Sequence, residues 1–341
     1  MMHMAETGRH TLSGQVVQLD RKYPLVMLAS GERVRCKHST DLMKNADVRA
    51  VVGDFVAIDY PQGQDMPLIA LVEPRSTQLI RKDPAERSLP QVLAANFDLV
   101  LVVHPLNQLN IARLQRELVL AYETGARVGV VLTKSDLAES PEDIVQAQDA
   151  VRRQVGDACP VITISNEEEA HGLEAVRAMI PAGVTAVLIG RSGVGKSSMV
   201  NLLAGSEVQR TGEVREFDGK GRHTTVSRCI VDIPGGGRVV DMPGVRGLGM
   251  WEADQGIGAA FYDVETWAQE CKFNDCTHTG EPGCAVARAV RDGELSPERL
   301  AAYVKLKDET ATIRRRKEQA AWKHGKIGNV RTFKQKHNRS Q

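Results

Sequence analysis

The segment GRSGVGKSS, residues 190–198, constrains the fold of this chain more than any other feature. It lies between TAVLI, which is typical of a buried strand, and MVNLLAG, which can form a helix. In this context the spacing Gly-x4-Gly-Lys-Ser predicts a loop whose backbone N–H groups surround phosphates, while Lys196 reaches the terminal phosphates and Ser197 can bind Mg²⁺. The positive end of the following helix strengthens the attraction. We therefore expect a nucleotide site at Gly190, Arg191, Ser192, Gly193, Val194, Gly195, Lys196, Ser197 and Ser198.

Two downstream segments fit the magnesium side of such a site. The strand-like run RVVDMPG ends in Asp241-x-x-Gly244, where the carboxylate can hold Mg²⁺ through water and the glycine amide can contact a terminal phosphate. The polar loop DGKGRHTTVS lies between this run and the phosphate loop, and Thr224 or Thr225 can complete the Mg²⁺ shell. In isolation these segments would be an ordinary turn and an ordinary hairpin loop. Their position after the phosphate loop favours the functional interpretation.

A third motif, TKSD, directly follows the strand-like run ARVGVVL and fits the recognition of guanine. The carboxylate of Asp136 can accept hydrogen bonds from guanine N1–H and N2–H₂, which adenine does not present, and the stem of Lys134 can pack on the base or the loop. Thr133 stands where GTPases usually have Asn. After the next strand, Ser165 and Asn166 can present backbone groups to guanine O6. In isolation TKSD would more often be the turn that starts a helix.

The motifs occur in an unusual order, because the base reader and its support precede the phosphate loop, the polar loop and DxxG. A parallel sheet can be cut at one loop and rejoined at its former ends without disturbing its site, since domain ends commonly lie close together. The order therefore predicts a circular permutation. It also places DxxG directly before the C-terminal residues, so the nucleotide state can act on them through little intervening chain.

The chain divides into three predicted domains. Residues 1–75 contain short strand-like runs separated by Gly and Pro, which predicts a small β-barrel, with the OB type as a candidate. Such barrels often bind RNA, and a module that packs or docks on protein is an equally open alternative. Residues 76–248 alternate strands with helices, which predicts a doubly wound α/β domain. Residues 249–341 contain helix-like segments, including GIGAAFYDVETWAQ and the stretch that begins at Pro297.

Four potential metal ligands lie within fourteen residues, in the pattern Cys271-x4-Cys276-x-His278-x5-Cys284. Three thiolates and one imidazole complete a tetrahedral Zn²⁺ site with no open position, so the pattern predicts a structural rather than a catalytic zinc. The alternative is a chance cluster of thiols. The other cysteines are predicted to be buried small apolar residues: Cys36, Cys159 and Cys229.

A net charge of +1 conceals an uneven charge distribution. Residues 311–341 contain ten Lys and Arg and one acidic residue, Glu318, which leaves the remainder acidic, at −8. The basic segment predicts contact with nucleic acid, although such runs are often only solvated helix faces. We expect residues 324–341 to fold only on a partner. Without a long apolar run or a signal-like N-terminus, we expect a cytoplasmic monomer with no membrane contact.

With these motifs in place, the chain resembles the circularly permuted RsgA/YjeQ GTPases of small ribosomal subunit biogenesis. The resemblance covers almost the whole chain and rests on TKSD, GRSGVGKSS, GRHTT, DMPG and CKFNDCTHTGEPGCAV. It implies an N-terminal OB barrel, a central permuted GTPase domain and a C-terminal helical zinc module. It also implies that GTP is hydrolysed to GDP and phosphate with Mg²⁺, and that the small ribosomal subunit, whose rRNA is bound, stimulates hydrolysis late in maturation.

The resemblance further implies that His223 places the attacking water, alongside Lys196 on the phosphates. Val245 follows DxxG, where Ras-type enzymes have a Gln, and valine can neither donate nor accept. The alternative is that His223 only touches phosphate or rRNA. Two other functions stay open at this point: a transport or signalling GTPase without an RNA partner, and an RNA-binding module with an inactive nucleotide site. Intact Lys196, Ser197 and Asp241 disfavour the second of these.

Overall fold

The computed structural model describes residues 11–19, 23–44, 49–61, 63, 65–82, 90–156, 158–165, 172–206, 228–242 and 253–337, without the side chains of 44, 82, 90 and 320–337. The chain forms two compact units, one of residues 1–80 with 91–248 and one of residues 81–90 with 249–341. Five of the predicted site residues lie outside the described residues: Asn166, His223, Thr224, Thr225 and Gly244.

The first unit begins with a group of short strands, which we call the β-module (residues 11–72). Its elements are β1 (Thr11–Leu19), β2 (Pro24–Leu28), β3 (Arg33–Arg35), β4 (Lys37–His38), α1 (Thr40–Lys44), β5 (Phe55–Asp59) and β6 (Leu68–Val72). β1 pairs antiparallel with both β2 and β5, β2 pairs with β3, and β6 joins β5 to β4. Alternate side chains such as Val16, Val56 and Ile58 form its buried core. The strands agree with the sequence prediction, whereas the short helix α1 was not predicted.

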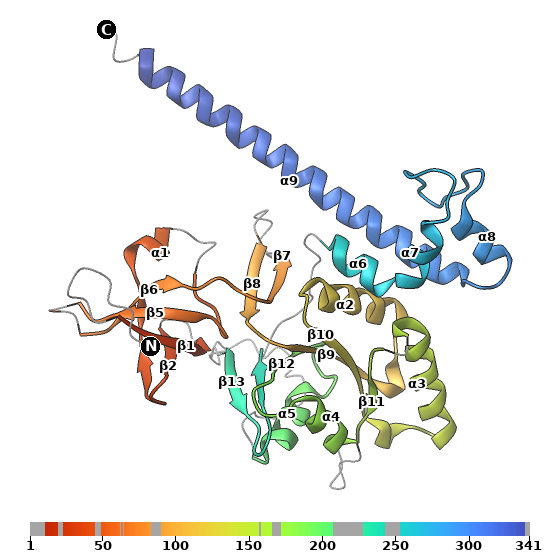
Figure 1. Cartoon of the computed structure of the whole chain (residues 1–341), viewed down its shortest axis with the longest axis horizontal. Helices are drawn as coiled ribbons and strands as arrows, with labels where there is room; N and C mark the ends of the chain where they lie inside the picture. The colour runs from red at the N-terminus through yellow and green to blue at the C-terminus, as the bar shows by residue number, and fades with distance from the viewer. Residues whose placement is uncertain are drawn as a thin grey trace, which may run out of the picture. The chain divides into compact units, whose positions relative to one another are not determined.

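The rest of this unit is a mixed sheet with helices on both faces (Figure 1). Its strands are β9 (Leu99–Pro105), β10 (Arg127–Thr133), β11 (Val161–Thr163), β12 (Thr185–Ile189), β13 (Arg228–Asp232) and β14 (Arg238–Asp241). Its helices are α2 (Ile111–Glu123), α3 (Pro141–Val155), α4 (Leu173–Met179) and α5 (Lys196–Ala204), with 3-10 turns η2 (Leu106–Gln108) and η3 (Ser135–Leu137). The strand order is β11-β10-β9-β12-β14-β13, and β13 is antiparallel to its neighbour β14.

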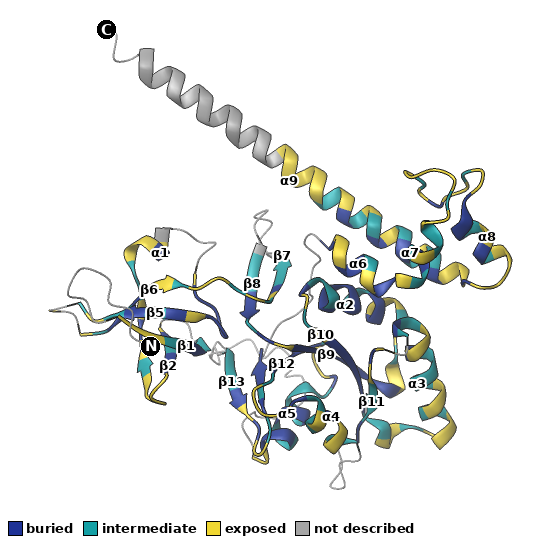
Figure 2. Cartoon of the chain, in the orientation of Figure 1, coloured by how far each residue is buried: buried dark blue, intermediate teal, exposed yellow. Residues whose placement is uncertain are grey.

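The central strands are buried on both faces, as their continuous apolar sequences predict (Figure 2). Leu99, Leu101 and Val103 of β9 pack in one core with Val176 of α4 and Met199 of α5. Because side chains alternate along a strand, the intervening residues of β9 face the opposite side, where α2 contacts the strand. Ser140 caps the α3 helix, and Pro141 is its first residue.

The strand order places the predicted motifs at one point of the sheet. From β9 the chain proceeds outward to β10 and β11, while from β12 it proceeds in the other direction to β14 and β13. The carboxyl ends of β9 and β12 are parallel neighbours where these directions diverge. Ligands of open α/β sheets bind at such a switch point. The phosphate loop follows β12 directly, so the fold positions it for that role.

One pairing joins the β-module to this sheet, and an isolated bridge joins it to a separate pair of strands. β1 pairs antiparallel with β13, so one sheet runs from β11 through to β4. Val52 forms a parallel bridge with Ala94 of β8 (Pro90–Ala95), a strand that pairs with β7 (Gln78–Lys82). Neither this hairpin nor the shared sheet was predicted. The two strands of the hairpin are short and flank a polar stretch, and the shared sheet depends on segments that are distant in the sequence.

The second unit contains the ends of β7 and β8 and, from residue 253 on, is helical in its described residues. It contains α6 (Asp254–Ala260), α7 (Tyr262–Ala268), α8 (Ala285–Arg291) and α9 (Pro297–His337). The predicted single helix in GIGAAFYDVETWAQ is wrong, because Phe261 leaves helical geometry, with φ −120° and ψ 40°, and its buried ring separates α6 from α7. α8 was not predicted.

The expected unfolded C-terminal segment is also corrected by the structure, since α9 continues to His337. After Pro297 this stretch contains no proline, and its Lys, Arg, Gln and Ala residues favour helix. Ser296 caps the helix, accepting from the Arg299 amide at 3.1 Å. Within the described residues, no helix has the length and apolar character needed to cross a membrane.

Candidate nucleotide site and metal centre

The phosphate loop has the backbone geometry that wrapping around a phosphate needs. Gly190 adopts φ 147°, and a Cβ there would lie 2.3 Å from the Val103 carbonyl oxygen, so only glycine fits. Gly195 immediately precedes α5 in the left-handed region, which turns the loop into the helix. The Nζ of Lys196 donates to the carbonyl oxygens of Gly190 and Arg191, each at 2.7 Å. The loop thus surrounds the ammonium group at the start of α5, where the helix dipole favours anions.

Asp241 faces the same cradle from the end of β14. The residue is 6% exposed, and its Oδ2 is buried with no hydrogen-bond partner among the described residues. Burial raises the pKa of Asp241 to about 6, while Lys196 acts in the opposite direction. Burial also lowers the pKa of Lys196, whereas the negative charges of Glu117 and Asp241 act to raise it. A buried acid with an unused oxygen fits a site that receives positive charge, so this residue suits a hydrated Mg²⁺.

Thr133 joins the base-reading strand to the phosphate loop. It is fully buried, and its Oγ1 lies 2.5 Å from the Val194 carbonyl oxygen and 3.2 Å from that of His104. A hydroxyl has one hydrogen to donate, and the shorter distance favours Val194 as acceptor. The residue that departs from the usual Asn therefore still contacts the loop.

The predicted base-reading residues lie together. Lys134 adopts φ 60°, a left-handed conformation that non-glycine residues rarely take, and η3 begins directly after it. Ser165, two residues after the end of β11, donates to Asp136 Oδ1 at 3.3 Å. Asp136 is exposed and Ser165 is buried. The hydrogen bond therefore reaches the carboxylate from the protein interior, and its outer side stays accessible.

A cavity of about 430 Å³ opens beside the phosphate loop, between the ends of β9 and β12. Residues from the loop line one side, and Lys134, Asn110 and Arg113 are among those that line the rest. His104, at the end of β9, is also part of the lining, and its Nε2 lies 2.6 Å from Glu117 Oε2 in a buried pair. His104, Arg113 and Glu117 were not predicted from the sequence. The histidine could have been noticed at the end of a strand beside the cradle, whereas the other two required the fold.

The predicted metal ligands form a compact cluster in the second unit. One ligand atom from each of Cys271, Cys276, His278 and Cys284 lies within 4.8 Å of the others. The sulfurs of Cys271 and Cys284 are 3.9 Å apart, and His278 Nδ1 lies 3.6 and 3.5 Å from them. Tetrahedral zinc requires separations of about 3.8 Å between sulfurs and about 3.5 Å from sulfur to nitrogen. The donor set and its spacing therefore fit Zn²⁺ bound through Nδ1.

The loop between these ligands is organised by Glu281. Its Oε1 accepts from the Thr277 amide and hydroxyl, and its Oε2 accepts from the amides of Thr279 and Gly280. These bonds lower the pKa of Glu281 to about 2, led by the Thr277 hydroxyl. His278 lies between the bonded residues in a left-handed conformation, with φ 60°. Sequence analysis missed this role of Glu281.

The remaining cysteines behave largely as predicted. Cys36 and Cys159 are buried, and Cys229 is half-buried. Burial raises the pKa of Cys36 and of Cys229 to about 11, which keeps both thiols protonated near neutral pH. They act as small apolar side chains.

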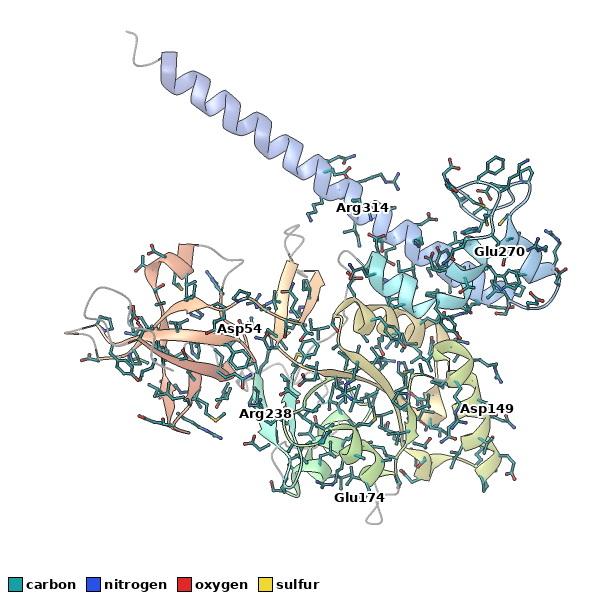
Figure 3. All side chains as sticks on the ribbon, viewed as in Figure 1. Asp54, Asp149, Glu174, Arg238, Glu270 and Arg314 are labelled. Carbon is teal, nitrogen blue, oxygen red and sulfur yellow. The ribbon has the colours of Figure 1, made fainter. Side chains whose placement is uncertain are left out.

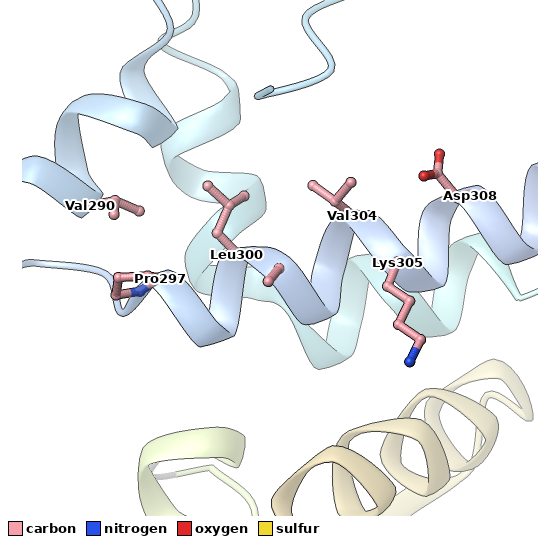
Figure 4. Close-up of a pocket in the computed structure, with 7 residues that line it drawn as sticks. Val290, Pro297, Leu300, Val304, Lys305 and Asp308 are labelled. Carbon is pink, nitrogen blue, oxygen red and sulfur yellow. The ribbon is translucent and has the colours of Figure 1, made fainter. Parts of the chain in front are cut away.

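A second hollow, of about 550 Å³, follows α9 in the helical unit (Figure 4). Val290, Leu300 and Val304 give it an apolar lining, with Lys305 and Asp308 at its side. It offers no backbone cradle for phosphates and is not a candidate nucleotide site.

Comparison with known sequences identifies relatives over most of the chain. The family model described as RsgA GTPase matches residues 72–251. A protein of Streptomyces avermitilis named small ribosomal subunit biogenesis GTPase RsgA is 39% identical over 306 residues, which cover 89% of this chain and 80% of the relative. A protein of the same name from Mesorhizobium japonicum is 43% identical over 274 residues, covering 76% of this chain and 75% of the relative.

Two solved structures have a similar fold. The crystal structure of YjeQ from Thermotoga maritima superposes with a TM-score of 0.65 at 24% identity, covering 88% of this chain and 99% of that chain. YloQ, a circularly permuted GTPase, superposes with a TM-score of 0.62 at 25% identity, covering 91% and 98%. The fold is therefore the one predicted from the reversed order of motifs.

Proposed function

The chain belongs to the RsgA GTPase family, and from this premise we propose that it hydrolyses GTP to GDP and phosphate in small ribosomal subunit biogenesis. The observation that carries the proposal is the buried Asp241 carboxylate, whose Oδ2 lacks a partner among the described residues, facing the cradle that holds Lys196. The donors of the loop suit the phosphates, and the base-reading side of the site suits guanine.

Each described residue has a definite task in this proposal. Lys196 would exchange its bonds to loop carbonyls for bonds to the terminal phosphates, where it stabilises developing negative charge. Asp241, with Ser197 at the start of α5, would hold the hydrated Mg²⁺. The bound Mg²⁺ supplies positive charge to the phosphate oxygens. Asp136, held by Ser165, would accept from guanine and so discriminate against adenine.

Several finer assignments complete the proposal. The pairing of β1 with β2 and β5 supports an OB-type module within residues 1–75, followed by the GTPase domain at 76–248 and a helical zinc module at 249–341. The ligand spacings support a structural Zn²⁺. The charge of residues 311–341 supports rRNA as a partner, with the chain acting as a monomer in the cytoplasm. His223, with Thr224 or Thr225 as a Mg²⁺ ligand, remains a prediction outside the described residues.

The first test is GTP hydrolysis by the full chain with and without small ribosomal subunits, for the wild type and for His223→Ala. Stimulation by subunits that disappears in the variant is expected. Stimulation that persists would contradict the proposed role of His223 only. Hydrolysis that never responds to subunits would contradict the ribosomal function and favour a transport or signalling GTPase.

A second variant tests the site itself. Asp241→Asn keeps the size of the side chain and removes the charge that the proposal assigns to Mg²⁺. We expect it to raise the Mg²⁺ concentration that half-saturates hydrolysis by at least about tenfold. An unchanged Mg²⁺ dependence would show that this carboxylate does not support the metal.

A further inference from the structure

A row of three paired residues connects the β-module to the nucleotide site. Gln18 of β1 lies opposite Cys229 of β13, and Cys229 lies opposite Asp241 of β14. Opposed residues of antiparallel strands have Cα atoms about 4.5–5.5 Å apart, so Gln18 lies only about 10 Å from Asp241. The next pair, Leu19 with Arg228, extends the β1 contact to the first residue of β13.

The β-module also contacts the opposite end of the same hairpin. Arg238, which is labelled in Figure 3, is the first residue of β14. Its guanidinium donates to Gln15 Oε1 at 2.9 Å. Gln15 is 6% exposed, and its Nε2 donates to the Gly53 carbonyl oxygen at 3.1 Å. Its amide therefore bonds on both sides, to the GTPase sheet and to the β-module. A buried polar group with both sides satisfied favours one arrangement of the surrounding elements.

The β-module is also in close contact with the end of β8 and with the residues between β8 and β9. The Gly53 carbonyl oxygen also accepts from Asn96 Nδ2 at 3.1 Å, just before β9. A Cβ at Gly53, whose φ is 94°, would lie 1.9 Å from the Ala95 carbonyl oxygen, so the two backbones are in close contact. Neighbouring Asp54 is fully buried and receives two bonds of 2.8 Å from Arg75. These contacts and buried hydrogen bonds therefore fix the position of β1.

These contacts matter because Asp241 is the last residue of β14. Its position depends on the hairpin of β13 and β14, and β13 has β14 on one side and β1 on the other. Without β1, that side of β13 would be an edge with unpaired backbone groups. We propose that Gln15 and strand β1 position Asp241 through this hairpin, so that the Mg²⁺ affinity of the nucleotide site depends on the seating of the β-module. The inference rests on the proposed role of Asp241 as the Mg²⁺ carboxylate.

The proposal gives the β-module a function in addition to any ligand it binds. Coupling between two sites is reciprocal in binding free energy. If a seated β1 raises the affinity for Mg²⁺ and nucleotide, then Mg²⁺ and nucleotide stabilise the seated β-module to the same extent. A macromolecule that displaces the β-module would accordingly lower the affinity of the nucleotide site for Mg²⁺.

The test is a Mg²⁺ titration of the binding of a fluorescent GDP analogue to the full chain. Gln15→Ala removes both bonds of the buried amide, and we expect the half-saturating Mg²⁺ concentration to rise about threefold to tenfold. GDP binding without Mg²⁺ and the thermal unfolding midpoint, measured on the same samples, show whether the variant is folded. The control is Arg33→Ala, since Arg33 of β3 and Asp232 of β13 also join the β-module to this hairpin, at 4.0 Å and through exposed side chains. It should leave the Mg²⁺ dependence unchanged.

A covalent rescue separates positioning from general destabilisation. Gln18→Cys places a thiol opposite the native Cys229, at a Cα separation that a disulfide can span. In the double variant Gln15→Ala/Gln18→Cys, the reduced protein should show the weakened Mg²⁺ dependence. The oxidised protein should return to within about twofold of the wild type, because the disulfide replaces the lost hydrogen bonds. Oxidised wild-type protein serves as the reference.

The outcomes distinguish the inference from the proposed function beneath it. If Asp241→Asn weakens the Mg²⁺ dependence while Gln15→Ala does not, the coupling is wrong and the site assignment stands. A defect in Gln15→Ala that persists after the disulfide has formed also contradicts the coupling. If Asp241→Asn itself has no effect, the assignment of the Mg²⁺ carboxylate is wrong and the inference falls with it.

Discussion

The Thr133 hydroxyl donates to the Val194 carbonyl over 2.5 Å, which ties the strand that carries the base-reading motif to the phosphate loop. The two residues are 61 positions apart in the sequence, and both are buried. The two halves of the proposed nucleotide site are therefore joined by a short hydrogen bond at the switch point of the sheet. The Thr that replaces the usual Asn keeps a connection of this kind.

We expect Thr133→Val to lower the affinity for GDP by about tenfold, because it leaves the buried Val194 carbonyl without this donor. The measurement is the dissociation constant of a fluorescent GDP analogue. Thr124→Val is the matched control: Thr124 is also buried, and its hydroxyl donates to the Ala121 carbonyl at the end of α2 at 2.6 Å. That variant should lose stability and keep its GDP affinity. Equal losses of affinity in both variants would contradict a specific role for Thr133.

The raised pKa of Asp241 predicts that this carboxylate destabilises the nucleotide-free protein at neutral pH. Burial raises its folded-state pKa to about 6 from 3.8, so between these pH values the folded state binds more protons than the unfolded state. The contribution of Asp241 to the free energy of unfolding must then fall as pH rises from about 4 to about 6, by at most about 3 kcal/mol. Above that range it stays low.

Asp241→Asn should therefore stabilise the nucleotide-free protein above pH 6 while impairing the Mg²⁺ dependence of hydrolysis. The check is chemical unfolding of both proteins without nucleotide at pH 4.5 and pH 7.5. The advantage of the variant should be largest at pH 7.5. A variant that is less stable than the wild type at pH 7.5 would show that the ionised carboxylate has a partner that compensates for its burial.

The parts of the site that sequence analysis predicted are those encoded by short spacings. The phosphate loop and the metal ligands each lie within fourteen residues, and the family comparison confirmed the resemblance drawn from them. The residues that it missed act across the fold. His104 meets Glu117 through the packing of β9 on α2, and Gln15 meets Arg238 across 223 positions. Such pairs have no periodicity or motif, so only the tertiary structure identifies them.

The same reason explains the errors in secondary structure. The helical periodicity of the sequence continues through Phe261 and predicted a single helix. In the structure the ring of Phe261 is buried and packs edge-on against Tyr303 of α9, with 5.7 Å between the ring centres. The helix therefore breaks where tertiary packing requires it. The hairpin of β7 and β8 was missed because its two strands are short and flank a polar stretch.

Arg299 stabilises the junction of α6, α7 and α9. It is 4% exposed, donates to both Asp263 oxygens at 2.9 Å, and lies 4.3 Å from the centre of the Phe261 ring. We expect Arg299→Ala to cost about 3 kcal/mol in the stability of this unit, since it leaves Asp263 without its partner. Arg288→Ala, which breaks an exposed pair with Glu270, should cost less than about 1 kcal/mol. Hydrogen exchange of the α6 and α7 amides in the full chain measures both effects.

Glu281 should control the affinity of the metal centre without being a ligand. Its carboxylate accepts hydrogen bonds from Thr277, Thr279 and Gly280, on both sides of His278. Glu281→Gln replaces one acceptor oxygen by an NH₂ group that faces other donors, so the loop should no longer hold His278 in its left-handed conformation. We expect the dissociation constant for Zn²⁺ to rise about tenfold to a hundredfold, as when the hydrogen-bond partners of other metal ligands are removed. The measurement is competition with a chromophoric chelator, and Glu294→Gln, an exposed carboxylate outside the loop, is the matched control. Equal Zn²⁺ affinity in the two variants would mean that the metal alone organises the loop.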